Sequence, residues 1–273
     1  MRVHRARIEY IRKVHPETRR IGLVAEGISR DASPGQFYMV RAGEGHDPFL
    51  PRPFTMFRRR LEGDDPGCGA DGLEILFQVV GRGTRILSQM APGRTIDVLG
   101  PLGRGWRLKP ERDAVLVGGG MGVASLVCLA EELPVGQRQG SWVLLGARTS
   151  DRLWCVEELK GCGARVMTIV EEGDHAVRGT VLDLLDANRQ EIMRVATTLY
   201  ACGPAPMLKG VALWALQEGV DCQVSLESPM ACGVGVCLGC SVKDSRGAGY
   251  LRVCHEGPVM DAEEIDWGAW DGR

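Results

Sequence analysis

Four cysteines near the C-terminus carry the clearest chemical signal in the sequence. Cys232, Cys237, Cys240 and Cys254 are spaced C-x4-C-x2-C-x13-C. Cysteine thiolates bind zinc and iron–sulfur clusters, and zinc sites usually combine paired C-x2-C or Cys/His units. A C-x4-C-x2-C run followed by a distant cysteine is instead typical of plant-type [2Fe–2S] clusters. We therefore predict that these four thiols hold a [2Fe–2S] cluster, with a zinc site as the alternative.

The glycines between these cysteines fit the same prediction. Gly233, Gly235 and Gly239 separate the first three thiols. A loop around a four-sulfur core adopts unusual backbone angles and turns its N–H groups toward sulfur, which glycine allows. The gap before the fourth cysteine is shorter than in plant ferredoxins, so we expect a variant loop. The other cysteines are scattered singly, and we interpret most of them as buried or incidental thiols: Cys68, Cys128, Cys155, Cys162, Cys202 and Cys222.

A second group of glycines lies in the stretch VLVGGGMGVASL. Gly118, Gly119, Gly120 and Gly122 follow an apolar strand and precede a helix. Glycines let backbone N–H groups approach a pyrophosphate, and a helix N-terminus adds partial positive charge. The spacing differs from the standard G-x-G-x-x-G, so a tight turn without a ligand is the alternative. The choice between NAD and NADP stays open.

A cysteine ends the last predicted strand of this region. In YACGPAPML, Cys202, Gly203 and Pro204 follow an apolar run. Loops at the carboxyl ends of parallel strands line the ligand crevice, so Cys202 is a candidate to touch a nicotinamide ring. The alternative is a buried cysteine that only ends the strand.

Two stretches in the first hundred residues suit a phosphate-containing ligand. LPRPFTMF places Arg52 beside Pro53, where a guanidinium can hold a phosphate with two hydrogen bonds, and the Thr55 hydroxyl can reach a ring or a phosphate. GRGTRIL places Gly83 and Thr84 at a predicted helix start, a second possible phosphate site. An arginine that is simply solvated is the alternative for the first stretch.

The order of predicted elements indicates two domains and a short module. Residues 1–107 contain short alternating or β-branched runs between turn residues, which is typical of an antiparallel β-barrel. Residues 108–222 alternate strands with helices, which indicates a doubly wound parallel α/β sheet. Residues 223–273 are too few for an apolar core of their own, so a bound metal would help to order them.

The composition is that of an ordinary folded protein. The chain has 273 residues, of which 44% are hydrophobic and 25% charged, and its net charge is −2. This charge gives no indication of nucleic acid or of an anionic membrane as a partner. The basic N-terminal stretch lacks the apolar segment of a signal peptide, and no run approaches the ~20 apolar residues of a spanning helix. We therefore expect a cytoplasmic protein.

Together these motifs resemble the electron-transfer subunits of class 1B dihydroorotate dehydrogenases, within the ferredoxin–NADP reductase superfamily. The matching stretches span residues 34–265 and are PGQF, RPFT, VVGRGTRIL, DVLGPLG, GGGMGVASL, YACGP, SLESPMACGVGVCLGC and CHEGPVMDAEEI. The C-terminal stretches are the most specific, because few families place such a cysteine loop after a flavin barrel and a nucleotide domain.

The resemblance implies three cofactor sites. It implies FAD contacts by Arg52, Pro53, Phe54, Thr55, Leu76, Phe77, Gln78, Gly83 and Thr84. It implies pyridine-nucleotide contacts by Gly118, Gly119, Gly120, Gly122, Cys202, Gly203 and Pro204. It implies that Cys232, Cys237, Cys240 and Cys254 bind the [2Fe–2S] cluster.

The sequence departs from the family pattern in three places. Gln78 stands where the family often has arginine or tyrosine. Residues 63–72 predict a longer hairpin than usual, and the tail DWGAWDGR has no assigned role.

The resemblance also implies an electron relay in pyrimidine biosynthesis. A separate FMN-containing catalytic subunit oxidises dihydroorotate, and electrons pass singly through the cluster to FAD, which passes hydride to NAD+. The chain itself shows no paired acid and base suited to abstracting a proton from a substrate. We expect the cluster module to pack against the FMN subunit in a heterotetramer of two such pairs.

Two other functions stay open. The first is a subunit of an NADH-dependent ferredoxin–NADP reductase or sulfide dehydrogenase, which shares the barrel, the nucleotide domain and the cysteine loop. The second is a non-catalytic, zinc-binding interaction subunit. The intact RPFT and GGGMGVASL segments argue against the second function.

Overall fold

The structure, a computed structural model, describes residues 1–43, 45, 47–60, 71–193, 197–247, 249–270 and 272. Most of the predicted 63–72 hairpin, including Cys68, lies outside the described residues. No helix in the described ranges is long and apolar enough to cross a membrane.

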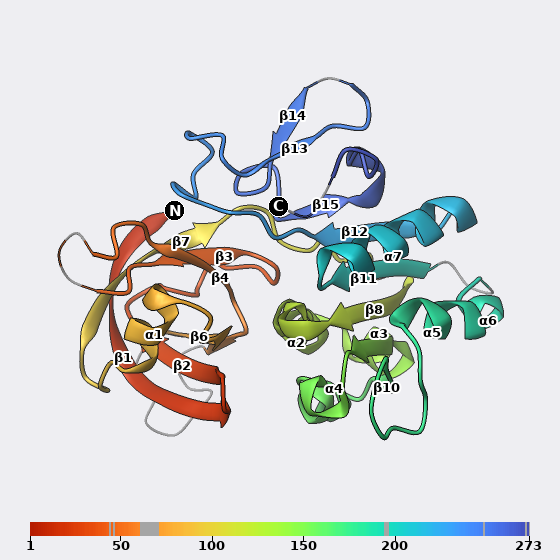
Figure 1. Ribbon diagram of the computed structural model, residues 1–273, viewed down its shortest axis with the longest axis horizontal. Helices are drawn as coiled ribbons and strands as arrows, with labels where there is room; N and C mark the ends of the chain where they lie inside the picture. The colour runs from red at the N-terminus through yellow and green to blue at the C-terminus, as the bar shows by residue number, and fades with distance from the viewer. Residues whose placement is uncertain are drawn as a thin grey trace.

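The N-terminal part is a curled antiparallel sheet (Figure 1). Its strand order is β4-β3-β7-β1-β2-β6-β5, and helix α1 (Arg82–Ser88) follows β6. The strands are β1 (Arg2–His15), β2 (Thr18–Val24), β3 (Phe37–Val40), β4 (Arg52–Thr55), β5 (Arg58–Arg60), β6 (Gly72–Gln78) and β7 (Thr95–Leu102). The predicted antiparallel β-domain is confirmed.

Strand β3 has a buried side chain on both of its faces. Tyr38 and Val40 lie in the apolar core inside the curled sheet. Phe37 and Met39 instead belong to a second core that they share with the rest of the chain. Because side chains alternate along a strand, this four-residue run joins two cores at once, which explains why all four residues are apolar and buried.

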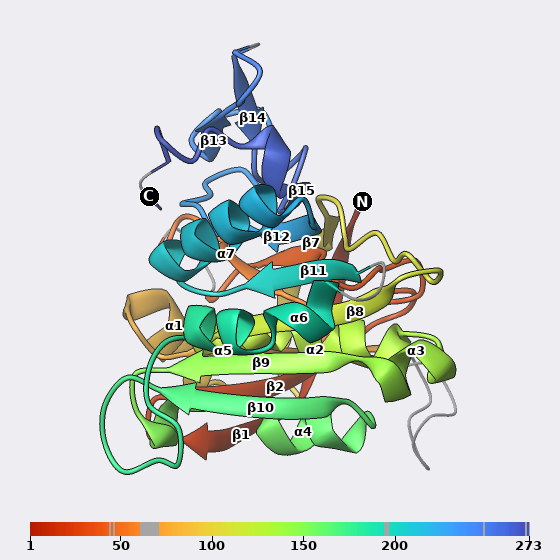
Figure 2. The same ribbon diagram turned by 90° about the vertical axis from the view of Figure 1, so that its right-hand side faces the viewer.

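The middle of the chain forms the predicted parallel α/β sheet, with strand order β10-β9-β8-β11-β12-β15. Its strands are β8 (Asp113–Gly119), β9 (Trp142–Ala147), β10 (Arg165–Val170), β11 (Thr197–Cys202), β12 (Asp221–Ser225) and the antiparallel edge strand β15 (Val259–Asp261). The helices are α2 (Val123–Glu132), α3 (Val135–Gly140), α4 (Val156–Gly161), α5 (Val181–Ala187), α6 (Arg189–Met193) and α7 (Ala205–Glu218), with 3-10 turns η1 (Gly120–Gly122) and η2 (Ser150–Arg152). Helix α2 faces the N-terminal sheet, and α5, α6 and α7 cover the opposite face (Figures 1 and 2).

Two details of this region differ from the sequence prediction. Residues 151–163, DRLWCVEELKGCG, predict one helix that ends at Gly161 and Gly163. The structure instead has two segments there, because Cys155 adopts a left-handed φ of 60° and separates η2 from α4. Helix α3 was not predicted; Pro134 precedes it, and none of its residues is buried.

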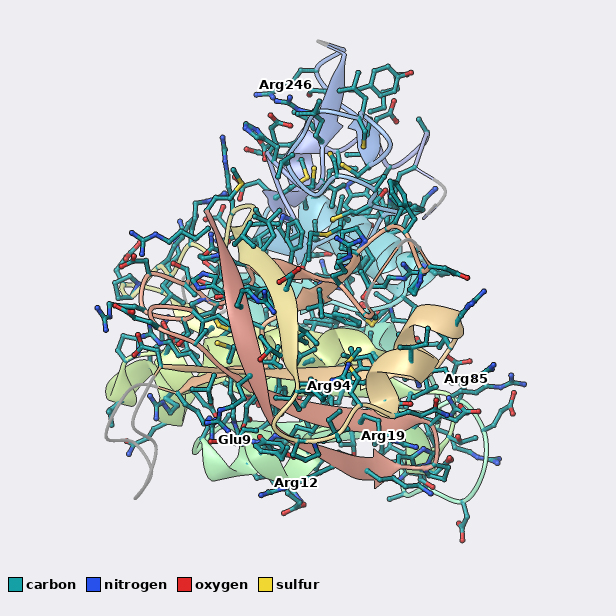
Figure 3. The ribbon with its side chains drawn as sticks, turned by 90° about the vertical axis from the view of Figure 1, so that its left-hand side faces the viewer. Glu9, Arg12, Arg19, Arg85, Arg94 and Arg246 are labelled. Carbon is teal, nitrogen blue, oxygen red and sulfur yellow. The ribbon has the colours of Figure 1, made fainter. Side chains whose placement is uncertain are left out.

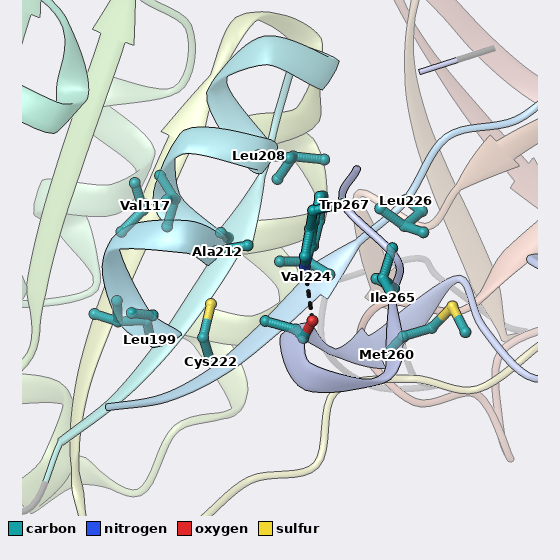
Figure 4. Packing of buried hydrophobic residues seen from close by; sticks show 14 of the residues in the cluster. Val117, Leu199, Leu208, Ala212, Cys222, Val224, Leu226, Met260, Ile265 and Trp267 are labelled. Carbon is teal, nitrogen blue, oxygen red and sulfur yellow. Dashed lines mark hydrogen bonds between the residues drawn. The ribbon is translucent and has the colours of Figure 1, made fainter. Parts of the chain in front are cut away.

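The C-terminal part is short and depends on the other two for its packing. It contains β13 (Ser241–Lys243), β14 (Tyr250–Arg252), η3 (Ala262–Glu264) and strand β15, which joins the large sheet beside β12. Figure 4 shows its buried residues Met260, Ile265 and Trp267 packed against α7 and β12, with Trp267 Nε1 donating to the Ala262 carbonyl at 2.7 Å. The C-terminal part therefore has no separate core, as its length predicted.

Polar contacts tie the N-terminal sheet to the other parts. Arg58 and Arg59 of β5 form ion pairs with Glu131 and Glu132 of α2, at 2.5 and 2.9 Å. After β7, the backbone N–H of Arg104 donates to the Gly257 carbonyl at 2.5 Å. The parts are thus fixed against one another at two separate places.

Candidate functional site

Arg52 and Gly83 lie in contact, although 30 residues separate the two predicted phosphate-binding stretches. A Cβ built on Gly83 would lie 2.6 Å from Nε of Arg52 and 2.9 Å from its Cζ. The guanidinium from β4 therefore packs over the first turn of α1, and a side chain at position 83 would displace it. Within the described ranges, its hydrogen bond to the Leu50 carbonyl leaves most of its donors for a ligand.

The hydroxyls of Thr84 and Thr55 differ in their partners. Thr84 Oγ1 accepts hydrogen bonds from the backbone N–H groups of Val80 and Gly81 at 3.0 and 3.1 Å, so it already stabilises the start of α1. In the described part of the chain, the Thr55 hydroxyl has no hydrogen-bond partner and stays available to a ligand. These two roles depend on the folded backbone around each hydroxyl and are not visible in the sequence.

Strand β6 faces both the barrel and the nucleotide domain. Phe77 points into the barrel, where its ring centroid lies 5.5 Å from that of Phe54. Leu76 packs on the other side, in a core formed largely by the α/β domain. Gln78, on the same side of the strand as Leu76, is only partly buried. The contact between Phe54 and Phe77 brings β4 and β6 together inside the barrel, and the flavin contacts of these strands stay a prediction.

A cavity of about 740 Å³ lies beside α1. Ile86 and Met90 supply apolar lining from α1 and its C-terminal end, and Arg5, Arg41 and Arg94 add positive charge. Figure 3 views this side of the molecule and labels Arg85 on α1 and Arg94 just before β7. The cavity is lined by residues from the same helix as Gly83 and its C-terminal end, together with residues of β1 and β7.

The two nucleotide motifs meet at the carboxyl ends of β8 and β11. A Cβ on Gly122 would lie 2.5 Å from the backbone N of Gly203, and one on Gly119 would lie 3.2 Å from Cδ of Pro204. Cys202 pairs with Gly118 across the parallel ladder. The predicted glycine turn and the predicted Cys-Gly-Pro turn thus form one continuous surface.

Cys202 is held as a neutral thiol. Burial raises its pKa to about 12, the charge of Glu227 adds to the effect, and a hydrogen bond with Ser225 opposes it. The side chain is 3% exposed. Cys202 is therefore suited to pack against a ligand ring and unsuited to act as a nucleophile, because the thiolate is the reactive form. Its contact with a nicotinamide stays a prediction.

The four predicted cluster ligands come together as two pairs. The Cys240 thiol lies 3.2 Å from Sγ of Cys254, and both residues are 2% exposed. Cys232 and Cys237 form the outer pair, in which the backbone N–H of Cys237 donates to Sγ of Cys232 at 3.5 Å. The inner pair faces the core and the outer pair faces solvent, where Cys237 is exposed.

Backbone N–H groups point at these sulfurs, as the glycine-rich loop predicted. Gly235 donates to Sγ of Cys254 at 3.1 Å, and Val234 donates to Sγ of Cys232 at 3.4 Å. Gly233 and Gly235 have φ angles of 71° and 79°, which place them in the left-handed region that glycine tolerates. The loop therefore provides a ring of donors for negatively charged sulfur.

The Cys254 thiol of the inner pair needs a positive charge nearby to ionise. Burial, together with the hydrogen bond and charge of Cys240, raises the pKa of Cys254 to about 12. Burial also opposes ionisation of Cys232, but hydrogen bonds from the backbone N–H groups of Cys237 and Val234 outweigh it and lower the pKa to about 6. Metal coordination would supply the missing charge, because a coordinating thiol is deprotonated.

The paired arrangement fits two metal ions better than one. Within the described ranges, no three Cys, His, Asp or Glu side chains are grouped so that they could hold one metal ion. A zinc site needs four ligands around a single point. A [2Fe–2S] cluster takes four thiolates, two on each iron, which matches one outer and one inner pair of thiols.

Sequence reasoning missed the charged residues beside the cysteine loop. Arg252 donates to the Gly235 carbonyl at 3.1 Å. It also donates to the Glu256 carboxylate at 3.0 Å, and this second hydrogen bond is the main cause that lowers the pKa of Glu256 to about 2. The pair anchors the segment that carries Cys254 to the loop that carries the other thiols. An (i, i+4) Arg–Glu pair next to a ligand was visible in the sequence, but its contact with Gly235 was not.

Comparisons with known proteins agree with this geometry. Residues 227–266 match the family model of the iron–sulfur cluster binding domain of dihydroorotate dehydrogenase B. The chain is 37% identical to the dihydroorotate dehydrogenase B (NAD(+)) electron transfer subunit of Desulforamulus reducens, over 97% of this chain and 99% of that protein. It is 38% identical to the subunit of the same name from Caldanaerobacter subterraneus subsp. tengcongensis, over 85% and 86% of the two chains.

Solved structures share the fold. A structure of an NADH-dependent reduced ferredoxin-NADP oxidoreductase has a TM-score of 0.80 and 30% identity, over 96% of this chain and 90% of that one. A ferredoxin NADP+ reductase from Neisseria gonorrhoeae with bound FAD and NADP has a TM-score of 0.62 and 17% identity, over 80% and 92%. The predicted fold class and the stated resemblance are confirmed: the chain belongs to the family of dihydroorotate dehydrogenase B (NAD+) electron transfer subunits.

Proposed function

We propose that this chain passes electrons from an FMN-containing catalytic subunit to NAD+ through a [2Fe–2S] cluster and FAD. The observation that carries the proposal is the packing of the four-cysteine loop onto Met39 of β3 and Leu102 of β7, because β3 pairs directly with β4, the strand that bears predicted flavin contacts. Family membership gives the same function, since the relatives are named as electron transfer subunits.

The bound groups supply the redox chemistry. An iron–sulfur cluster exchanges single electrons, nicotinamide exchanges hydride, and a flavin exchanges either. The chain contributes binding, orientation and exclusion of water. Arg52 would hold the FAD diphosphate over Gly83, and the Thr55 hydroxyl would donate or accept at the ring. The glycine turn at Gly118, Gly119, Gly120 and Gly122 would take the pyrophosphate of NAD.

The cavity beside α1 suits the adenosine half of FAD. It lies beside the helix that begins near Gly83, and it combines the apolar side chains of Ile86 and Met90 with three arginines and one carboxylate, Asp97. A purine ring needs apolar walls, and the adjacent phosphates need positive charge. FAD would then lie with its diphosphate at Arg52, its adenosine beside α1, and its ring toward Thr55.

The outer thiol pair marks the side from which electrons enter. Val236 and Leu238, on either side of Cys237, are 79% and 61% exposed. Leu238 also holds a left-handed φ of 59°, an unfavourable conformation for a leucine. Exposed apolar side chains around a redox group suit a protein interface. We propose that the FMN subunit covers them, in a cytoplasmic heterotetramer of two such pairs.

An anaerobic pull-down of the tagged protein from its own cells tests this function. The eluate should contain an FMN subunit and should reduce NAD+ when dihydroorotate is added. An eluate that reduces NAD(P)+ only with reduced ferredoxin or sulfide would assign the chain to the related oxidoreductases. A colourless protein with stoichiometric zinc and no acid-labile sulfide would remove the redox function altogether.

A further inference from the structure

Met39 lies on the same sheet face as two of the predicted flavin contacts. In the antiparallel pairing of β3 with β4, Met39 stands opposite Pro53, and Phe37 stands opposite Thr55. Directly opposed residues of such a pair present their side chains on the same face. Met39 is therefore next to the part of β4 whose Thr55 hydroxyl is available to a flavin.

The side chain of Met39 contacts the cysteine loop. A Cβ built on Gly233 would lie 2.6 Å from Cγ of Met39 and 2.9 Å from its Sδ. Gly233 directly follows the ligand Cys232 and has a left-handed φ of 71°. The loop backbone thus packs directly on the methionine, with no side chain of its own in between.

The contact is fully enclosed. Met39 is 1% exposed, and it shares one core with the inner thiols of Cys240 and Cys254. Leu102 of β7 closes the remaining side, 3.4 Å from the same Cβ position on Gly233. Through Met39 and Leu102 the cysteine loop thus packs on β3 and β7, and β3 pairs directly with β4, the strand that carries predicted flavin contacts.

We propose that Met39 is a positioning residue that holds the cluster loop against β3, next to the predicted flavin contacts of β4, and sets the rate at which electrons pass between the two groups. The inference rests on the proposed function, because it requires both groups to be bound. Electron transfer slows steeply when packed atoms between two redox groups are replaced by a gap. Met39 contacts the cluster loop at Gly233 and stands opposite Pro53 of β4, so it would control the rate without touching the substrate.

Electrons and protons balance in the proposed transfer between the cluster and the flavin. In each transfer the reduced cluster loses one electron and the flavin gains one. After two transfers and uptake of one proton, the reduced flavin gives a hydride to NAD+ and returns to its oxidised form. With NADH as the reductant the same steps run in reverse, so NADH alone reduces first the flavin and then the cluster.

Anaerobic stopped-flow mixing of the purified holoprotein with NADH separates the two steps. Flavin absorbance reports the hydride step, and cluster absorbance reports the transfer between the groups. In Met39→Ala the hydride step should keep the wild-type rate, whereas the cluster step should slow several-fold. Met39→Leu, which keeps the volume, should restore most of the rate. Met39→Val leaves a smaller gap than Met39→Ala, so the cluster step should slow less. This variant also tests the proposal if Met39→Ala fails to fold.

Gly233→Ala probes the same contact from the loop side, since the new methyl group would push the loop away from Met39. Gly247→Ala is its control: Gly247 lies in the same module with a φ of 72°, and nothing stands within 4 Å of its Cβ position. Met260→Ala is the control for Met39, because Met260 is another buried methionine of the same core. Both controls should keep both rates.

Electron paramagnetic resonance of the reduced cluster and the thermal unfolding temperature show whether each variant keeps its cluster and fold. The proposal is overturned if Met39→Ala holds full cluster and flavin but transfers at the wild-type rate, or if Met260→Ala slows the cluster step equally. A wild-type protein that takes up no cluster or no flavin on reconstitution would instead refute the proposed function.

Discussion

Gly122 packs so closely on Gly203 that a Cβ on the first would lie 2.5 Å from the backbone N of the second. The contact joins the turn after β8 to the turn after β11. Because backbone atoms stand on the far side, a side chain at Gly122 cannot be accommodated by a rotamer change. The two turns must separate, or the helix behind them must move.

Gly122→Ala is therefore expected to weaken binding of the pyridine nucleotide. Overpacking of this kind costs about 1–3 kcal/mol. The apparent Kd for NADH should rise, while FAD and iron content stay at the wild-type level, since neither site includes this contact. Isothermal titration with NADH and cofactor analysis would measure both quantities.

Gly136→Ala is the matched control for that substitution. Gly136 lies in α3 and has open space at its Cβ position. Alanine is preferred over glycine in a helix by about 1 kcal/mol, so this variant should be at least as stable as the wild type. Equal loss of NADH binding in both variants would mean that the contact with Gly203 has no role.

Arg52 should determine the affinity for FAD. Losing a charge-assisted hydrogen bond costs about 1.5–3 kcal/mol, which corresponds to a rise of about ten- to a hundred-fold in Kd. Arg52→Ala should therefore purify with little flavin. Arg52→Lys should recover only part of the affinity, because an ammonium group does not make the paired contacts of a guanidinium. Fluorescence titration of the apoprotein with FAD would measure the constants; full affinity in the lysine variant would contradict a two-bond contact.

The elements that carry a strong local signal were predictable from the sequence. The alternation in β1, the strand–glycine–helix run at Gly118, and the cysteine spacing all depend on residues close together in the chain. The glycines of the cluster loop were also informative, because the left-handed backbone angles of such a loop favour glycine. These features gave the fold class and the candidate ligands.

The contacts between the segments were not predictable in the same way. Nothing local indicates that Met39 would meet Gly233, or that Arg52 would lie over Gly83, because these pairs come from different strands and loops. The hydroxyls of Thr55 and Thr84 looked equivalent, yet one stabilises a helix start and the other is available. Long-range packing decides these roles, and a single sequence does not record it.

Cys240→Ser should abolish the cluster. Cys240 belongs to the buried inner pair, and a serine hydroxyl in place of the thiolate weakens iron binding within an apolar site. Iron and acid-labile sulfide should fall to background, and the C-terminal part should become more sensitive to protease, because metal binding contributes to folding. FAD and NADH binding should persist.

Cys162→Ser serves as the comparison, since Cys162 is a partly buried thiol at the end of α4. It should keep full iron and sulfide. Retention of the cluster in Cys240→Ser, or its loss in Cys162→Ser, would disprove the assignment of the ligands. Zinc bound in place of iron after growth with both metals would instead support a structural metal site.

Asp221 should make stability depend on pH at the acidic end. Lys109 and Arg112 bind its carboxylate at 2.6 and 3.0 Å, and the hydrogen bond from Lys109 is the main cause that lowers the pKa of Asp221 below its ordinary value of 3.8. The unfolded chain then takes up a proton more readily than the folded one. The ion pairs therefore stabilise the fold above pH 3.8, and this stabilisation is lost as the pH falls below it.

Asp221→Asn tests this dependence through the free energy of unfolding in urea at a series of pH values. The wild type should be the more stable protein near pH 7. The difference between the two should shrink below pH 3.8, because the wild-type carboxyl is then increasingly protonated. Asp174→Asn, at an exposed position without an ion pair in the described residues, should show no such trend. A difference that stays constant across the series would mean that the charge of Asp221 contributes nothing to stability.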